Sequence, residues 1–329
     1  MENINEELAK EIEKTALAHG FSSCGIIPLS AMDGYAAKFY ERMEKVPESV
    51  PFYQRFEGLT KIKERYPWAK SLIICVSSFA KYKFPKELQG KYAKGFLLSR
   101  NNHHESKDYQ GKKAFEAWLS QKGMHWEGGD GSGFGQVGGL RYAAVTAGLG
   151  IIRHNNFFYD ENGSCTELDG YVIDAECTLY HHKTFTPCSD RCGLCRKNCP
   201  THALSDANTM NPLLCASFCT TFANGMTIPG ITEEMLGTRV MGCDTCQDVC
   251  PYNRRKKWDE GEDYPGLEEM VTTLDPAHLA EASDEEIREK VICWTDDHME
   301  PNQTEFIRQN ARRALRQSLC KDAADLSVK

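Results

Sequence analysis

Two cysteine runs of identical spacing are the residues of this chain best suited to chemistry. Each follows the pattern C-x2-C-x3-C-P, and the six cysteines are Cys192, Cys195, Cys199, Cys243, Cys246 and Cys250. Four-iron clusters are held by cysteine thiolates that converge from one tight loop and from one more distant position. Two such runs in one chain therefore predict two 4Fe–4S clusters near residues 188–251.

The spacing also predicts which thiolates share a cluster, because in two-cluster ferredoxins the cysteine before proline ligates the other cluster. The first cluster is then expected to take Cys188, Cys192, Cys195 and Cys250. The second is expected to take Cys199, Cys243, Cys246 and one further thiolate. We choose Cys215 as that eighth ligand, with Cys219 one helical turn away as its competitor. Three residues separate Cys188 from Cys192, so a one-residue bulge is expected there.

A pair of zinc sites is the alternative, since C-x2-C also suits tetrahedral zinc. Zinc sites do not require a third cysteine at x3 followed by proline in both runs, so the sequence favours clusters. The remaining cysteines are scattered, and we expect them to be small buried apolar residues; they are Cys24, Cys75, Cys165, Cys177, Cys293 and Cys320.

Composition indicates a cytoplasmic protein. The N-terminal twenty residues are acidic and lack the basic flank and apolar run of a signal peptide, and the apolar run Leu72–Val76 is too short to span a bilayer. Fifteen cysteines in a reducing compartment indicate metal binding rather than disulfides. The net charge of −8 gives no overall attraction to nucleic-acid phosphates.

Helical and strand-like patterns alternate before the cysteines, as in a layered α/β domain. Apolar residues at helical spacing end at Gly20 and a first strand follows at 24–28; a second is expected within 67–80. Ser106 is expected to cap a helix that ends at Gly123, and a shorter helix is expected over 140–147.

Composition changes at Pro187 and again after Asn253. We therefore expect three regions: an α/β cofactor and substrate domain over 1–186, a ferredoxin-like module over 187–255 and a helical C-terminal extension over 256–329. The last helix, 306–319, is basic on one face, and we expect a solvated surface helix.

Beyond these patterns, the chain resembles the epoxyqueuosine reductases and, more distantly, the reductive dehalogenases. The most specific matches are Cys192–Thr201, Gly242–Asn253 and Ala147–Gly150. Tyr92–Gly95 and Lys107–Tyr109 are similar to the family's Y-A-R-G and R-D-Y segments. The family's last ligand of the second cluster falls sixteen residues after the Cys-Pro cysteine, which is the interval from Cys199 to Cys215.

The resemblance implies an N-terminal domain that holds cobalamin with its lower base detached, close to a cluster that reduces the cobalt. It also implies electron supply from a ferredoxin or a flavodoxin. Proton donation would fall to Tyr109 and to Asp130 or Glu127, which replace the family's Asp. The implied cofactor-binding residues are Arg141, Gly148, Gly150, Asn155, Phe158, Leu168 and Asp244.

Three departures from the family shape the functional prediction. The segment before Leu140 is rich in glycine and lacks the family's Asp-Pro, Arg153–Asn156 replaces a lysine segment, and the tRNA-gripping repeat domain is reduced to the tail after residue 257. With the acidic net charge, these departures predict a cobalamin-dependent enzyme that reduces a small molecule, and they argue against tRNA as a partner. The alternatives are an epoxyqueuosine reductase acting on tRNA and a non-catalytic electron-transfer or corrinoid-reducing partner protein.

Overall fold

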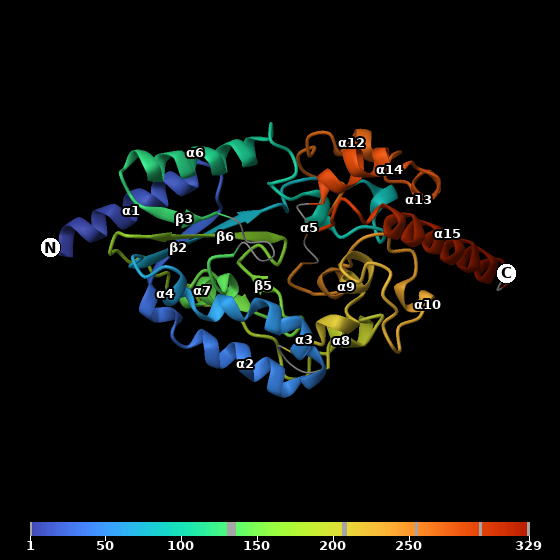
Figure 1. Ribbon diagram of the computed structural model, residues 1–329, viewed down its shortest axis with the longest axis horizontal. Helices are drawn as coiled ribbons and strands as arrows, with labels where there is room; N and C mark the ends of the chain where they lie inside the picture. The colour runs from blue at the N-terminus through green and yellow to red at the C-terminus, as the bar shows by residue number, and fades with distance from the viewer. Residues whose placement is uncertain (1, 130–135, 206–208, 254–255, 296–297, 328–329) are drawn as a thin grey trace. The chain divides into compact units, whose positions relative to one another are not determined.

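The computed structural model describes residues 2–129, 136–205, 209–253, 256–295 and 298–327 (Figure 1). Their contacts divide the chain into two compact units. The first unit comprises the chain up to Phe79 together with His104–Cys192. The second comprises Ala80–His103 and nearly all of the chain from Gly193 onward. The three regions expected from composition, 1–186, 187–255 and 256–329, stay a prediction.

The first unit is built on a four-stranded sheet in which every neighbouring pair is antiparallel. Its strand order is β1 (Ser23–Pro28), β2 (Ser71–Ser78), β6 (Thr166–Ile173) and β3 (Trp126–Gly128). Seven of the eight residues of β2 are buried, as expected of a central strand covered on both faces. The mixed α/β architecture predicted for this region is confirmed.

Helices cover both faces of this sheet, and alternate side chains of β2 point to each layer. Ile73 and Cys75 face a core built with α1 (Glu2–Ala18) and α6 (Lys107–Gln121). Leu72, Ile74 and Val76 face a second core built with α7 (Leu140–Thr146) and α4 (Ile62–Arg65). Figure 1 shows α1 and α6 on one side of the sheet and α4 and α7 on the other, with α2 (Tyr35–Lys45) and α3 (Val50–Tyr53) beyond them.

Local signals set these helix boundaries as the sequence predicted. The Ser106 hydroxyl accepts a hydrogen bond of 3.1 Å from the Tyr109 amide and caps α6. After the helix, Gly123 adopts φ +74°, and after α1, Gly20 adopts φ +89°. Glycine reaches this left-handed region without the steric cost that other residues meet.

The scattered cysteines follow their prediction in part. Cys24, Cys75, Cys165 and Cys177 are buried, and three of them lie in the core beneath α1 and α6. Cys293 and Cys320 are exposed, so the expectation of burial was wrong for these two.

The chain between α7 and β6 forms a small antiparallel hairpin of β4 (Ile151–Ile152) and β5 (Phe158–Tyr159). Two glycines allow close packing around it. A Cβ on Gly150 would lie 2.2 Å from the Tyr159 carbonyl oxygen, and one on Gly148 would lie 1.8 Å from the His181 carbonyl oxygen. These positions therefore require glycine for packing of the protein itself.

The second unit consists of short helices joined by loops, followed by one long helix. Its helices are α5 (Lys94–Leu97), α8 (Leu194–Asn198), α9 (Ala216–Thr221), α10 (Glu233–Leu236), α11 (Thr245–Asp248), α12 (Leu267–Met270), α13 (Pro276–Leu279), α14 (Asp284–Glu286) and α15 (Thr304–Ser327). Short 3-10 turns occur in both units, at Leu29–Met32, Pro47–Ser49, Gln54–Thr60, Lys86–Leu88, Pro212–Leu214 and Ile292–Trp294, and a π turn at Ile287–Val291.

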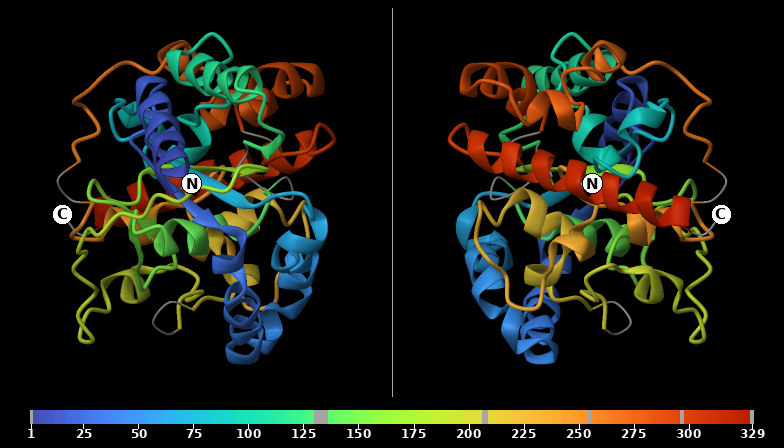
Figure 2. Two further views of the ribbon diagram at one scale, coloured as in Figure 1. Left: turned by 90° about the vertical axis from the view of Figure 1, so that its left-hand side faces the viewer. Right: turned by 90° about the vertical axis from the view of Figure 1, so that its right-hand side faces the viewer.

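Helix α15 differs from its prediction. It extends beyond 306–319 and packs against α13 and α10, and Figure 2 shows it as the long red helix. Arg313 is only 6% exposed, so the expectation of a wholly solvated basic face was wrong. None of the helices within the described ranges is long and apolar enough to cross a membrane.

The glycine packing generates a stability prediction. Gly148→Ala adds both a left-handed alanine and a clash with backbone, whereas Gly123→Ala, at nearly the same φ, has no atom within 4 Å of its new Cβ. We expect Gly123→Ala to lower the free energy of unfolding by about 1 kcal/mol, and Gly148→Ala to lower it by about 3 kcal/mol or more. Urea unfolding followed by circular dichroism measures both. Equal losses would show that the contact with His181 relaxes freely.

Candidate metal centre

Five of the predicted cluster cysteines come together within the second unit. Cys199 follows α8 and lies in a small buried cluster with Cys195, Ala203 and Leu204, against which Cys215 and Cys246 pack. Burial contributes most to the raised pKa of Cys246, and the nearby Cys215, Cys243, Asp244 and Cys199 raise it further. The thiols predicted to hold the second cluster, Cys199, Cys215, Cys243 and Cys246, are thus neighbours.

Burial makes these thiols poor thiolates by themselves. It raises the pKa of Cys215 to about 12, with the nearby Cys243 adding to the effect, and it raises the pKa of Cys246 well above its usual value. Only the thiolate is a metal ligand, so ligation must outweigh this cost by placing iron charge beside the sulfur atoms.

The competitor Cys219 lies in a different environment. Its Sγ is 3.6 Å from the Leu213 carbonyl oxygen, and the charged group that acts on it is Arg313 rather than another cysteine. Its amide donates a hydrogen bond of 2.9 Å to the Cys215 carbonyl, one helical turn earlier. The geometry therefore supports Cys215 over Cys219 as the ligand that we propose.

The gathered thiols do not form a site for one ion. Among the described residues, no three His, Cys, Asp or Glu side chains converge as the ligands of a single metal would. A four-iron cluster needs no such convergence, because each of its thiolates binds a different iron atom.

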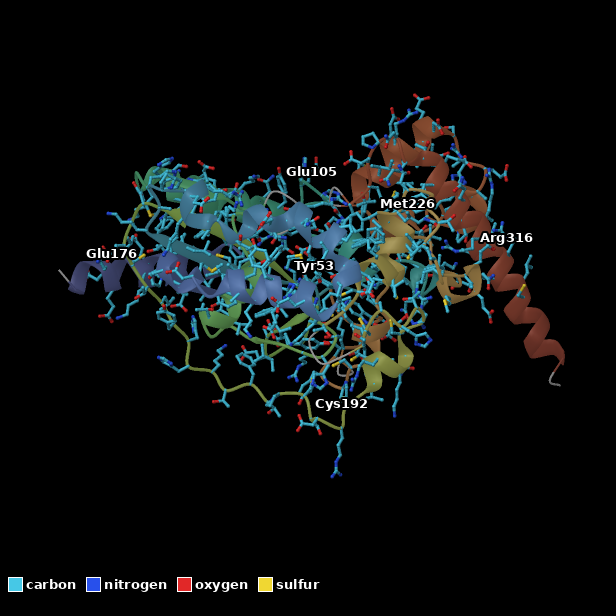
Figure 3. All side chains as sticks on the ribbon, turned by 60° about the horizontal axis from the view of Figure 1, so that its bottom comes forward. Tyr53, Glu105, Glu176, Cys192, Met226 and Arg316 are labelled. Carbon is cyan, nitrogen blue, oxygen red and sulfur yellow. The ribbon has the colours of Figure 1, made fainter. Side chains whose placement is uncertain are left out.

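The cysteines predicted for the first cluster are divided between the units. Cys188 and Cys192 end the first unit, and Cys195 and Cys250 belong to the second, so this ligand set stays a prediction. The extra residue between Cys188 and Cys192 is taken up by a turn in which the Cys192 amide donates to the Ser189 carbonyl at 2.8 Å. Figure 3 labels Cys192 at the end of the long loop that follows β6.

Both cysteine segments are contacted by arginine or histidine side chains that the sequence motifs did not indicate. In the first unit, Arg153 Nη1 lies 3.8 Å from Cys188 Sγ, and His154 Nδ1 lies 3.2 Å from the Cys192 carbonyl oxygen. In the second unit, Arg239 Nε donates to Cys243 Sγ at 3.1 Å. Nothing in the spacing of the cysteines could have identified these partners.

Asp244 was predicted to bind the cofactor, but it forms part of a buried ion network. Its Oδ2 accepts from the Lys94 amide at 2.7 Å and lies 3.2 Å from Lys94 Nζ, which also donates to Asp248 at 2.9 Å. Lys94 is 5% exposed, and its ammonium lies 5.0 Å from the centre of the Trp258 ring. Burial alone would lower the pKa of Lys94, but the two carboxylates outweigh it and raise that pKa.

The other predicted cofactor residues contact the protein itself. Arg141 Nη1 donates to the Asn156 carbonyl, and Asn155 Nδ2 donates to the Tyr159 hydroxyl at 2.8 Å. Phe158 is buried in the core beneath α7, and Leu168 packs against it. Gly148 and Gly150 meet backbone at the distances given above. These contacts explain each residue type without a cofactor, and the assignment of the set to a corrinoid stays a prediction from resemblance.

Of the predicted proton donors, Glu127 and Tyr109 lie on different elements, β3 and α6. Asp130 lies outside the described residues. Glu127 is exposed in β3 at the sheet edge, and Tyr109 is half-buried in the first turn of α6, stacked on His104 at 4.4 Å. In the part of the chain that the structure describes, no hydrogen bond joins Glu127 to Tyr109.

Sequence reasoning missed a second buried ion pair. Lys112 of α6 lies 2.9 Å from Asp169 of β6, and their side chains are 5% and 3% exposed. Asp169 lies in β6 between Leu168 and Gly170, so this strand carries a buried charge that needs a partner.

The Lys94 network predicts a large stability effect. Lys94→Met leaves the buried Asp244 without its cation, and breaking such a pair costs about 3 kcal/mol or more of unfolding free energy. Lys83→Met is the matched control, since the Lys83–Asp263 pair is exposed and such pairs contribute about 0.5 kcal/mol. Chemical unfolding of both variants tests this. Equal losses of unfolding free energy in the two variants would show that Lys94 does not stabilise the fold through Asp244.

Comparison with known proteins shows which sequences this chain is similar to. Residues 188–253 match the family model described as a 4Fe-4S double cluster binding domain. The epoxyqueuosine reductase of Cellulophaga algicola is 26% identical over 279 residues, which cover 78% of this chain and 82% of that protein. The Bacillus subtilis epoxyqueuosine reductase is 34% identical over 155 residues, 46% of this chain and 38% of that protein.

Solved structures share the fold. The epoxyqueuosine reductase from Streptococcus thermophilus superposes with a TM-score of 0.73 at 23% identity, covering 93% of this chain and 80% of that one. An epoxyqueuosine reductase crystallised with an epoxyqueuosine-modified tRNA-Tyr stem loop gives a TM-score of 0.72 at 21% identity, over 94% of this chain and 81% of that one.

The expectation that tRNA is not a partner was therefore wrong. It rested on the altered segments, the short tail after residue 257 and the acidic net charge, yet an epoxyqueuosine reductase solved with a tRNA stem loop matches 94% of this chain. The kinship inferred from the motifs is confirmed: this chain is an iron–sulfur oxidoreductase with a 4Fe–4S double cluster binding domain, related to the epoxyqueuosine reductases.

Proposed function

We propose that this protein is a reductase that passes electrons through two 4Fe–4S clusters to an epoxyqueuosine-type substrate carried on tRNA. One observation carries the proposal: the thiols of Cys199, Cys215, Cys243 and Cys246 are neighbours in a module of the double-cluster type. Kinship with epoxyqueuosine reductases supports the substrate class. This substrate replaces the small molecule expected from the sequence.

Charge pairing restricts where a tRNA backbone could be recognised. On α15, Arg308 pairs with Asp284 and Glu305, Arg312 with Glu305, and Arg316 with Glu233. Figure 3 labels Arg316 on this helix. Arg312 and Arg316 are 44% and 55% exposed in these pairs, so both remain accessible to the phosphates of the proposed complex, whereas Arg308 is 15% exposed.

Cobalamin is part of the proposal on the ground of resemblance alone. When bound, it would supply the two-electron reductive chemistry. Because Gly148, Gly150, Asn155 and Phe158 are explained by packing, we assign no step to them. Retention of cobalamin by the purified chain under anaerobic conditions tests this part, and a chain that reduces substrate while retaining none would remove the corrinoid from the proposal.

The ligand assignment predicts a difference between two neighbouring cysteines. Cys215→Ser should lower the iron content after anaerobic reconstitution from about eight to about four atoms per chain, because it removes one thiolate of the second cluster. Cys219→Ser should keep about eight, since its thiol lies toward Leu213 and Arg313. Iron and acid-labile sulfide analysis measures both. The reverse result would make Cys219 the ligand.

The substrate assignment has its own test. The protein, reconstituted with iron, sulfide and cobalamin and reduced with dithionite, is expected to convert an epoxyqueuosine-modified tRNA stem loop to the queuosine form, detected by mass spectrometry of the nucleosides. Cys215→Ser should abolish conversion, and Cys219→Ser is the matched control. A wild-type chain that holds both clusters but forms no product would support the non-catalytic electron-transfer alternative.

A further inference from the structure

The second predicted cluster has an arginine directly on one of its ligands. Arg239 Nε donates to Cys243 Sγ at 3.1 Å, and its Nη2 donates to Thr245 Oγ1 at 2.8 Å. The Thr245 hydroxyl is itself 3.4 Å from Cys243 Sγ. The guanidinium is therefore held in one orientation by two acceptors on the same loop.

The C-terminal helix fixes the backbone of this arginine. Arg313 of α15 donates through Nη2 to the Arg239 carbonyl and through Nε to the Gly237 carbonyl at 3.5 Å. Its Nη1 donates to Asn310 Oδ1 at 2.7 Å. Arg313 is 6% exposed, and burying a guanidinium against neutral acceptors is costly unless those contacts are all made.

The same helix holds the other side of the cysteine loop. Asn310 Nδ2 donates to the Thr220 carbonyl at 2.9 Å, and the Thr220 hydroxyl accepts from the Gly242 amide at 3.0 Å. Gly242 directly precedes Cys243. Helix α15 thus fixes the chain at Arg239 and at Gly242, the two sides of the Arg239–Cys243 contact.

We propose that Arg239 raises the reduction potential of the second cluster through its hydrogen bond to Cys243, and that Arg313 is a positioning residue for Arg239. One-electron reduction adds a negative charge beside the guanidinium, and a cation that donates to a ligand sulfur stabilises the more negative state. Removing it makes reduction harder and lowers the potential.

This inference rests on the proposed ligation by Cys243, and its test keeps the two apart. The full chain is reconstituted anaerobically with iron and sulfide, and EPR follows a redox titration without tRNA. Wild-type protein with about eight iron atoms and two reducible signals tests ligation. A wild-type chain without clusters defeats the ligation proposal, whereas the variants below decide the role of the arginines.

Arg239→Gln should make reduction of one cluster roughly tenfold less favourable, which for a one-electron couple is a potential about 59 mV lower. The other cluster should be unchanged. Arg239→Lys keeps the charge but loses the Nε donor, and its potential should fall between those of wild type and Arg239→Gln. If Arg239→Gln fails to hold iron, Arg239→Lys carries the test, and a wild-type potential there would overturn the inference.

The positioning step is tested by a double-variant comparison. Arg313→Gln should shift the same potential in the same direction by less, and Arg239→Gln/Arg313→Gln should equal Arg239→Gln alone, because Arg313 acts only through Arg239. Arg312→Gln, the adjacent residue paired with Glu305, is the control and should leave both potentials unchanged. Additive shifts from Arg239 and Arg313 would show that Arg313 does not position Arg239.

Discussion

The second unit depends on one physical constraint, the need to hold several thiols close together in a buried region where each must ionise to bind iron. Burial and mutual proximity oppose that ionisation, as the raised pKa values of Cys215 and Cys246 show. Holding such thiols together in one loop costs free energy unless other segments fix the loop backbone and place cations beside it. The surrounding elements of the unit do both.

The early segment 80–103 supplies one of these supports, although it ends 140 residues before Cys243. The Val240 amide donates to the Lys91 carbonyl at 2.7 Å, and the Ala93 amide donates to the Met241 carbonyl at 2.9 Å. A Cβ on Gly242 would lie 2.4 Å from the Ala93 Cβ, so the two chains pass in close contact. The Y-A-K-G segment is thus a structural partner of the cysteine loop, with Lys94 as its buried cation.

The sequence predicted well what depends on local spacing. The cysteine runs, the Ser106 cap and the strand within 67–80 were predicted from neighbouring residues, and the structure agrees with them. Local spacing could not predict which residues pair over long distances in the chain. The contacts of Lys94 with Asp244, Lys112 with Asp169 and Arg313 with Arg239 each join residues 57 or more positions apart. Arg313 was expected in solvent because periodicity locates a polar face without showing what covers it.

The error over tRNA has a similar cause. Net charge is a property of the whole chain, whereas phosphate recognition depends on a local patch. The basic face of α15 does not by itself indicate whether the helix binds phosphate. Three of its arginines pair with carboxylates, and the fourth, Arg313, is buried against the loop that carries Arg239. One arginine of a basic helix face is thus directed into the protein, where Arg313 holds the backbone of Arg239, while Arg312 and Arg316 stay 44% and 55% exposed.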